Sequence, residues 1–231
     1  MANQHDAKIE DFASDYLKKH YTQQCSLSNI LVSHSEKTRR GAKADGILVF
    51  KKDLNEVFVA SVSMEQASAL TTLLVNFKKQ GLGLLRFVTP LLVAAGCFLL
   101  GKSINNLLVM LVAPVIVAPL AFMLHSYLQK KFYIRQVEKI LDNVRSIPAD
   151  EHWIGLSVSS LVFRKNQLAN ILLSLCAEKG IGLITVGQRA KVVLMHKPDR
   201  TNCRRSDFLT YYESEENIRK AVLGDHVLRV A

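Results

Sequence analysis

Cysteine is scarce in this sequence and poorly placed for covalent or metal chemistry. The 231 residues include only four cysteines. They are far apart and form no Cys-x-x-Cys pair: Cys25, Cys97, Cys176 and Cys203. The seven histidines show no His-Glu-x-x-His or comparable spacing. The sequence therefore predicts neither a disulfide framework nor a zinc site, and we expect reduced thiols.

Charge is almost absent from one window of the chain. Between residues 82 and 128 the only formally charged side chains are those of Arg86 and Lys102. The window contains two apolar runs, 82–101 and 107–128, and each is close to the ~20 residues that a helix needs to cross a bilayer. Only the sequence KSINN separates the runs, so two spans would be antiparallel. The pattern predicts a transmembrane helical hairpin.

Proline gives some support to another interpretation, a buried hairpin in a soluble core. Pro90, Pro114 and Pro119 lie inside the apolar runs, and proline interrupts helices. Core helices of soluble proteins are seldom apolar on every face over this length, however, and membrane helices tolerate proline. The membrane hairpin is therefore favoured. Because the window contains no acidic residue, it does not favour a channel or transporter.

Basic residues flank the outer ends of the apolar window, whereas the connecting loop has Lys102 alone. The flanking residues are Lys78, Lys79, Lys130, Lys131 and Arg135. By the positive-inside rule, both termini are predicted to be cytoplasmic. The polar N-terminal sequence MANQHDAKIEDF has no apolar run typical of a cleavable signal. We expect an integral membrane protein with two spans and the lipid bilayer as a partner.

Two polar segments remain, 1–80 and 129–231, and each is short for an independent core. The first predicts a helix, the strands NILVSH, GILVF and EVFVASV, and a second helix that leads into the apolar window. The other segment predicts a helix around Val137 to Val144, the strand HWIGLSVSS, a helix capped by Gly180, and the strands IGLITV and KVVLMH. We expect the two segments to form two halves of one α/β domain.

The segment ADGILVF, in the second predicted strand, and the order of elements together resemble the restriction-endonuclease-like or PD-(D/E)xK fold superfamily. The core of that fold is αβββαβ. The sequence from HWIGLSVSS to IGLITV is similar to the later half of such domains. The resemblance covers nearly all of the chain outside the apolar window. It implies an αβββαβ domain with the transmembrane hairpin, 82–128, inserted after its second helix.

The same resemblance implies a site at which carboxylates hold Mg²⁺ and a lysine lies beside the attacking water. Asp45 matches the first Asp of the motif. The acid-x-lysine of the next strand should lie near Ser61 to Glu65. Neither Ser61-Val62-Ser63 nor Ser63-Met64-Glu65 supplies the lysine.

An active nuclease would therefore need compensating acids. Asp45 and Glu65 would hold the metal, and Glu10 on the first helix would add a third catalytic carboxylate. The sequence favours a degenerate, non-catalytic site for which no cofactor is expected, with Mg²⁺ required only by the active alternative. Lys-Ala-Asp-Gly is also a good turn sequence, so Asp45 is either a relic of the metal site or a turn residue.

Positive charge exceeds negative charge by ten, and two basic clusters stand out, KTRRGAK from Lys37 and RTNCRR from Arg200. The candidate binding residues in them are Arg39, Arg40, Lys43, Arg200, Arg204 and Arg205. Such clusters bind nucleic-acid phosphate, or they attract a domain to anionic lipid by about 1 kcal/mol per basic residue. Solvated loop charge without a specific role is the third interpretation.

Two functional hypotheses follow from these observations. The first is a membrane-anchored module whose restriction-endonuclease-like domain docks nucleic acid or a protein partner, including a second copy of the chain, without catalysis. The second is an active, metal-dependent nuclease held at the membrane. They differ in whether Asp45, Glu65 and Glu10 converge on a metal.

Overall fold

The computed structural model describes residues 4–25, 29–52, 57–83, 85–187, 191–201 and 207–223. Within these ranges, the side chains of residues 4–10, 25, 65, 80 and 85 are not among those described. The helices are α1 Gln4–Cys25, α2 Glu65–Gln80, α3 Leu85–Ser103, α4 Leu107–Arg145, α5 Gln167–Lys179 and α6 Glu215–Leu223. The strands are β1 Ile30–Lys37, β2 Lys43–Lys51, β3 Val57–Ser63, β4 Glu151–Leu156, β5 Ile181–Val186 and β6 Val192–His196. Two short 3₁₀ helices, η1 Ser160–Val162 and η2 Leu209–Tyr211, complete the order.

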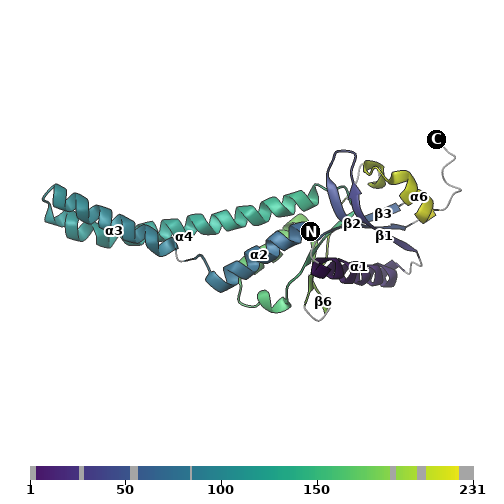
Figure 1. The fold of residues 1–231 in the computed structure, drawn as a ribbon, viewed down its shortest axis with the longest axis horizontal. Coiled ribbons are helices and arrows are strands. Elements are labelled where there is room, and N and C mark those ends of the chain that lie inside the picture. Colours follow the sequence, from purple (N-terminus) through teal and green to yellow (C-terminus); the bar gives the residue numbers. More distant parts are fainter. Residues whose placement is uncertain are drawn as a thin grey trace. The chain divides into compact units, whose positions relative to one another are not determined.

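One mixed sheet has the strand order β1-β2-β3-β4-β5-β6 (Figure 1). β1, β2 and β3 pair antiparallel, β3, β4 and β5 pair parallel, and β6 is antiparallel to β5. The pairing of β3 with β4 joins a strand that precedes the two apolar helices to one that follows them. The chain is therefore of the mixed α/β class, which confirms the broader part of the predicted fold.

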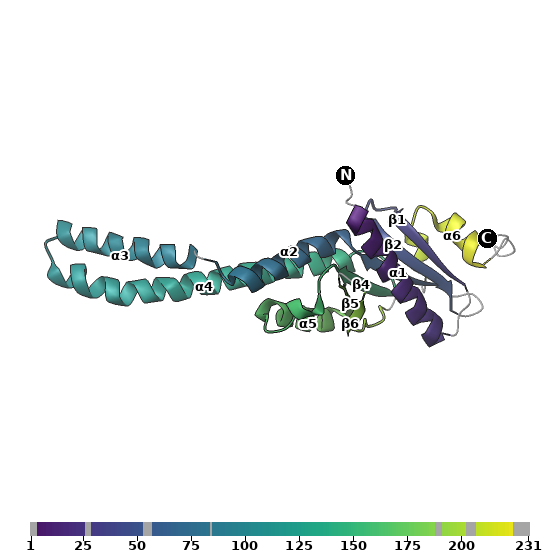
Figure 2. The same cartoon turned by 60° about the horizontal axis from the view of Figure 1, so that its bottom comes forward.

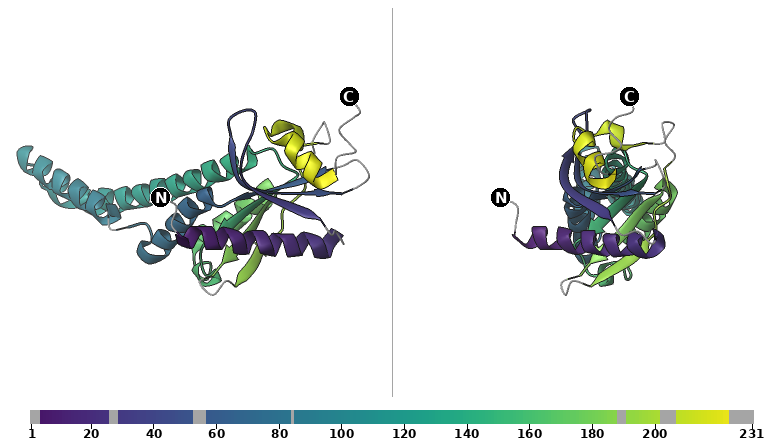
Figure 3. Two further views of the ribbon diagram at one scale, coloured as in Figure 1. Left: turned by 45° about the vertical axis from the view of Figure 1, so that its right-hand side comes forward. Right: turned by 90° about the vertical axis from the view of Figure 1, so that its right-hand side faces the viewer.

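Two apolar layers cover the sheet because side chains alternate across each strand. Leu48 and Phe50 of β2 pack with Leu17 of α1. Ile47 and Val49 of the same strand pack on the opposite face, together with residues of η2 and α6. Figure 3 shows α1 along one side of the sheet and α6 on the other. Burying each such side chain stabilises the fold by about 1.5–3 kcal/mol relative to exposing it.

Polar side chains at the start of β4 are buried but hydrogen-bonded. The Trp153 indole donates a 2.7 Å bond to the Tyr21 hydroxyl, which in turn donates to the Glu151 carboxylate. Asp150 accepts a 2.9 Å bond from the backbone amide of Val59. Burial raises the pKa of both carboxyl groups, although the hydrogen bonds from Tyr21 and Val59 act in the opposite direction. These bonds attach α1 and β3 to the beginning of β4.

Both ends of α5 have side-chain or glycine caps. The Asn166 Oδ1 atom accepts bonds of 3.1 and 3.4 Å from the amides of Leu168 and Ala169. Gly180 ends the helix with φ of 67°, a left-handed conformation that glycine adopts without steric cost. The prediction that Gly180 caps this helix is confirmed.

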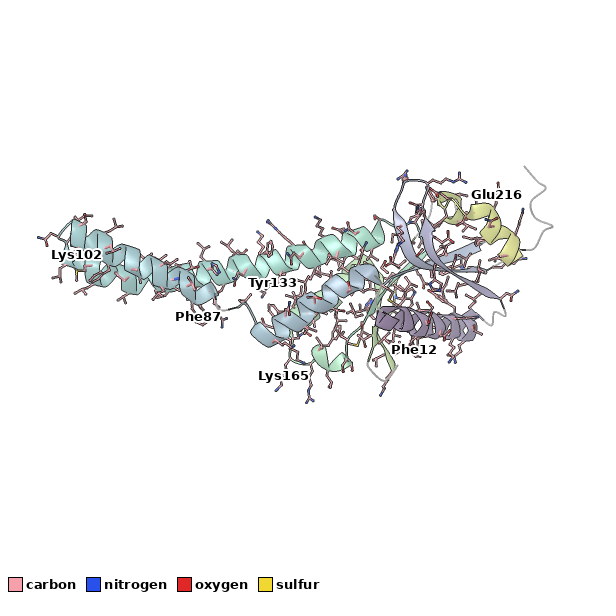
Figure 4. The ribbon with its side chains drawn as sticks, in the orientation of Figure 1. Phe12, Phe87, Lys102, Tyr133, Lys165 and Glu216 are labelled. Atoms are coloured by element: carbon pink, nitrogen blue, oxygen red, sulfur yellow. The ribbon has the colours of Figure 1, made fainter. Side chains whose placement is uncertain are left out.

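The two apolar helices, α3 and α4, form an antiparallel pair (Figure 2). Their backbones approach closely at Gly101, where a Cβ atom would lie 2.5 Å from the backbone of Met110. Figure 4 shows Lys102 at the closed end of the pair. By length and composition, both helices could cross a membrane. Many of their large apolar side chains are exposed, as in Leu91 and Val115.

The longest difference from the sequence-based boundaries concerns α4; in addition, α3 is Leu85–Ser103 where 82–101 was expected, and β4 ends at Leu156, before the end of the expected strand HWIGLSVSS. The second apolar run was expected to end at residue 128, with a separate helix around Val137 to Val144. Instead α4 continues from Leu107 to Arg145 without interruption. The intervening sequence QKKFYIRQ contains no glycine or proline, so nothing in it ends a helix.

Candidate functional site

Asp45 lies on β2 beside the N-terminus of α2. Its Oδ2 atom accepts a 2.8 Å hydrogen bond from the backbone amide of Met64. Met64 immediately precedes α2, and its carbonyl accepts a 3.2 Å bond from the amide of Ser68. The amides at a helix N-terminus carry partial positive charge, which favours a carboxylate at this position. Asp45 therefore has a structural role at the start of α2.

The interpretation of Asp45 as a turn residue is wrong. Asp45 and Gly46 both lie within β2, and Gly46 is paired with His34 on one side and Val62 on the other. The turn of this hairpin comes earlier, at residues 38–42, where Gly41 has a positive φ of 83°. The strand continues past Asp45 because both neighbouring strands supply ladder hydrogen bonds.

Ser61 and Ser63 of β3 occupy positions at which the resemblance predicts an acid and a lysine. Both serines are buried. The Ser61 Oγ atom lies 3.0 Å from Nδ1 of His152 on β4. The Ser63 hydroxyl has no hydrogen-bond partner among the described residues. A charged side chain at either position would lose its hydration, which costs several kcal/mol unless a partner compensates.

Ser61 and His152 have the contact of a nucleophile and its base, but burial argues against this role. Ser61 is 0% exposed and His152 is 2% exposed. A substrate carbonyl or phosphate must reach the nucleophile's oxygen for covalent catalysis. The pair is better explained as a buried hydroxyl and imidazole that satisfy each other.

Glu10 and Glu65, the other acids of the predicted active site, have side chains outside the described set. Of the two, only Glu65 is placed next to Asp45 by its backbone, because α2 starts directly after β3. Glu65 is the first residue of α2. A Cβ atom at Gly155 would lie 2.5 Å from Sδ of Met64 and 3.7 Å from Cβ of Ala13, which is one helical turn after Glu10. Among the described side chains, no three of His, Cys, Asp or Glu form a group that could hold a metal.

The first basic cluster has members in different environments. Arg39 is exposed and forms a 2.9 Å ion pair with Glu215 of α6. Its backbone amide also donates to the carbonyl of Tyr211, at 2.8 Å. Lys43 is exposed at the beginning of β2 and lies opposite Lys37. Arg40 is exposed and has no ion-pair partner in the described part of the chain.

The second basic cluster is described only in part. Arg200 lies 3.6 Å from Oδ1 of Asp150. Its guanidinium carbon also lies 5.6 Å from the ring centroid of Phe58. Arg200 therefore compensates a buried carboxylate and has less freedom to bind a ligand. Arg204 and Arg205 lie outside the described residues.

A pocket of about 280 Å³ is lined by described residues of both clusters. Its walls come from the β1–β2 turn, the segment from the end of α4 to the start of β4, the segment after β6, and η2 with the residues before it. The lining residues that carry its chemistry are Arg40, Arg145, His152, Thr201, Phe208 and Tyr211. We refer to this site as the arginine pocket. It brings together Arg40 from the first cluster and Thr201 from the second.

Hydrogen bonds between distant segments hold the walls of the arginine pocket. Thr38 forms an isolated antiparallel bridge with Tyr212. The Tyr212 hydroxyl donates a 2.8 Å bond to the carbonyl of Pro148, which also lines the pocket. Tyr212 is fully buried, and burial raises the pKa of its hydroxyl above its ordinary value. The turn that carries Arg40 is thus fixed relative to the segment that follows Arg145.

The electrostatics of the arginine pocket favour an anion. No Asp or Glu is among the described residues that line it. Arg40 and Arg145 form no ion pair with any described residue, and both are exposed. Burial, and secondarily the charge of Arg145, lowers the pKa of His152 to about 4, so His152 is neutral near pH 7. The pocket is therefore lined by two arginines that have no ion-pair partner among the described residues.

Sequence reasoning found Arg40 but missed the other residues of the arginine pocket. Arg145 lies in the last turn of α4, where a basic residue is ordinary, and His152 lies within an apolar strand sequence. Phe208 and Tyr211 were not assigned to any element. The one available signal was that Thr201 belongs to the second basic cluster.

Comparison with known proteins adds no assignment. No family model, curated protein or solved structure matches the chain. What the site can do is therefore argued from its geometry. Asp45 is engaged at a helix start, the two serines are buried and neutral, and the arginine pocket is cationic.

Proposed function

We propose that this protein is a membrane-anchored binding module whose cytosolic, restriction-endonuclease-like domain docks nucleic acid without cutting it. The observation that carries the non-catalytic part is the environment of Asp45. Its carboxylate accepts the amide that begins α2. Ser61 and Ser63, which stand where the acid and lysine are needed, are neutral and buried.

The anchoring part of the proposal is supported by α3 and α4. Both are apolar and long enough to cross a bilayer. At most 6% of the membrane-length stretch in each helix is buried within the protein. An exposed apolar surface of this kind is stable when lipid covers it. The excess of basic residues at the two outer ends favours an orientation with both termini in the cytoplasm.

The binding part of the proposal is supported by unbalanced positive charge. The chain has a net charge of +10. Arg40 and Arg145, which come from different parts of the sequence, line one pocket. Guanidinium groups bind phosphate through paired, charge-assisted hydrogen bonds, and contacts of this type dominate affinity for nucleic acids. A protein partner would instead be expected to use apolar surface with a polar rim.

A nuclease assay on the purified full-length protein tests this function. With Mg²⁺ or Mn²⁺ and single- or double-stranded DNA and RNA, we expect no cleavage but binding that weakens steeply as salt rises. Asp45→Ala and Glu65→Ala are compared with the wild type. Metal-dependent cleavage that either substitution abolishes would show that the site is active. If none of the DNA or RNA strands showed salt-sensitive binding, the nucleic-acid part of the proposal would be ruled out.

One observation favours the second candidate, a tethered nuclease. Glu65 directly follows Met64, whose backbone amide contacts Asp45, and Ala13, three residues after Glu10, lies near Gly155 of β4. Three carboxylates brought together here would be enough to bind Mg²⁺. The double variant Glu10→Gln/Glu65→Gln separates the two candidates. If the nuclease is active, this double variant should lose metal-dependent cleavage. If the domain only docks, neither protein cleaves and the variant binds strands as the wild type does.

A further inference from the structure

The geometry points to the arginine pocket as a binding site for one nucleotide unit, with its phosphate on Arg40 and Arg145 and its base against Phe208 or Tyr211. This inference deepens the proposed docking function and names the part of the nucleic acid that is held. The unit is a mononucleotide or the terminal nucleotide of a single strand.

The two arginines provide the phosphate-binding half of the site. They approach from separate segments, the β1–β2 turn and the end of α4, and both line the same pocket. Elsewhere in the described chain, arginines near this region are already paired: Arg39 with Glu215 and Arg200 with Asp150. Those pairs leave Arg40 and Arg145 as the guanidinium groups available at the pocket.

The charge at the pocket remains favourable after opposing contributions are included. The C-terminus of α4 carries a partial negative charge equivalent to roughly half an electron. Asp150 is the buried carboxyl group closest to Arg145 in the sequence. It accepts a hydrogen bond from the Val59 amide and lies near Arg200. Two full positive charges therefore exceed the opposing partial charge.

Size and aromatic content favour a single nucleotide over a larger ligand. The volume of about 280 Å³ is just below the ~300–1,000 Å³ of typical ligand pockets, which argues against a ligand larger than a single nucleotide. Phe208 and Tyr211 are partly exposed in its wall. Stacking of a base on an aromatic ring adds to binding and tolerates any base. A lipid phosphate lacks a base and would use the arginines alone.

Each arginine also has a simpler explanation that must be tested. A basic residue in the last turn of a helix interacts favourably with its C-terminal carbonyls, which would account for Arg145. A solvated charge on a turn would account for Arg40. Neither explanation predicts that the two residues act on the same ligand.

The test is a titration of the full-length protein, in neutral detergent, with four probes. They are adenosine 5′-monophosphate, adenosine, inorganic phosphate and glycerophosphoserine, which represents a lipid headgroup. We expect the monophosphate to bind most tightly and adenosine not to bind measurably. Equal affinity for the monophosphate, inorganic phosphate and glycerophosphoserine would overturn nucleotide recognition.

Matched variants identify the site of binding. Arg40→Gln and Arg145→Gln should each weaken monophosphate binding roughly ten- to hundredfold, because each removes a charge-assisted contact. The control Lys220→Gln removes an exposed charge on α6 outside the pocket lining and should change affinity less than about twofold. Phe208→Leu and Tyr211→Leu, tested separately, distinguish the stacking partner, with phosphate affinity unchanged in both. Equal losses in the pocket and control variants would contradict a specific site.

A second readout remains informative if a variant is poorly folded. In the wild-type protein, the imidazole NMR signals of His152 should shift on addition of the monophosphate, because the ring lines the pocket. Unchanged His152 signals at saturating ligand would place the binding site elsewhere. If the pocket variants bind single strands as the wild type does, the pocket inference fails while the docking function stands. If the monophosphate binds but no strand does, the docking function fails instead.

Discussion

His152 is a titratable side chain in an environment that favours its neutral form. It is 2% exposed, and its Nδ1 atom lies 3.0 Å from the Ser61 hydroxyl. Protonation would place a second positive charge near Arg145 in a poorly solvated site. Its pKa is therefore lowered from the ordinary value of 6.5 to about 4.

The lowered pKa predicts a dependence of stability on pH. Above pH 6.5, His152 is neutral in both the folded and unfolded states. As pH falls from 6.5 towards 4, the unfolded chain binds a proton that the folded protein does not, so about 2–3 kcal/mol of stability is lost. Thermal unfolding of wild type and His152→Gln, measured from pH 8 to 4, checks this. The wild type should lose more stability than the variant.

Comparison with the variant is needed because two carboxyl groups act with the opposite sign. Asp150 and Glu151 have raised pKa values in the folded protein, so their contribution to stability is greatest at low pH and declines as pH rises. These groups are common to wild type and variant, and their effects cancel in the difference. Parallel pH profiles of the two proteins would contradict the assignment of a neutral, buried His152.

Individual residues of the pocket differ in how far the sequence could predict them. Arg40 belongs to a visible run of basic residues, so its role could be proposed from sequence. Arg145 and His152 come near Arg40 only because the hairpin turn and the beginning of β4 meet in space. A contact of this kind depends on tertiary packing, and no local pattern records it. The engagement of Asp45 with Met64 has the same origin, since the two residues lie on different elements.

At the scale of elements, strong local signals were sufficient for most of the sheet and for α5. Alternating or continuous apolar runs predicted β2, β3, β5 and β6, and Gly180 predicted the end of α5; the Asn166 cap at its start was identified only in the structure. α6 was missed although Ile218, Ala221 and Val222 have helical spacing, because a helix of nine residues is too short to be stable alone and depends on tertiary contacts through Ile218. The length of α4 was missed because its end was placed where the apolar run gives way to polar residues. A change of polarity does not by itself end a helix, and α4 continues to Arg145.

The cap of α5 gives a prediction at this scale. Asn166→Ala removes the acceptor for the Leu168 and Ala169 amides, so we expect a loss of about 1 kcal/mol in stability. Asn166→Asp keeps the acceptor and should retain most of the stability. Asn170→Ala, an exposed site on the same helix, is the matched control. Denaturant unfolding of the detergent-solubilised protein measures the differences. Equal effects of the Ala substitutions at Asn166 and Asn170 would refute the cap.

At the scale of the whole molecule, the proposed orientation in the membrane can be tested by chemical labelling. In a variant without native cysteines, Ser103→Cys should react with a membrane-impermeant maleimide in intact cells, because it lies at the closed end of α3 and α4. Ser35→Cys on β1 should react only after the membrane is permeabilised. Both serines are exposed in the structure, so accessibility within the protein does not explain a difference. Equal reaction at the two sites in intact cells would contradict the orientation.

The pairing of β3 with β4 has a consequence for how the protein is synthesised. At translation rates of ~5–20 residues per second, the ribosome needs on the order of ten seconds to proceed from Ser63 to the end of β4. During this interval the hydrogen-bonding edge of β3 has no partner strand, although its seven residues are all buried in the finished fold. An exposed, apolar strand edge pairs readily with other chains. The nascent protein is therefore most vulnerable to aggregation while its two apolar helices are being made, before a single residue of β4 exists.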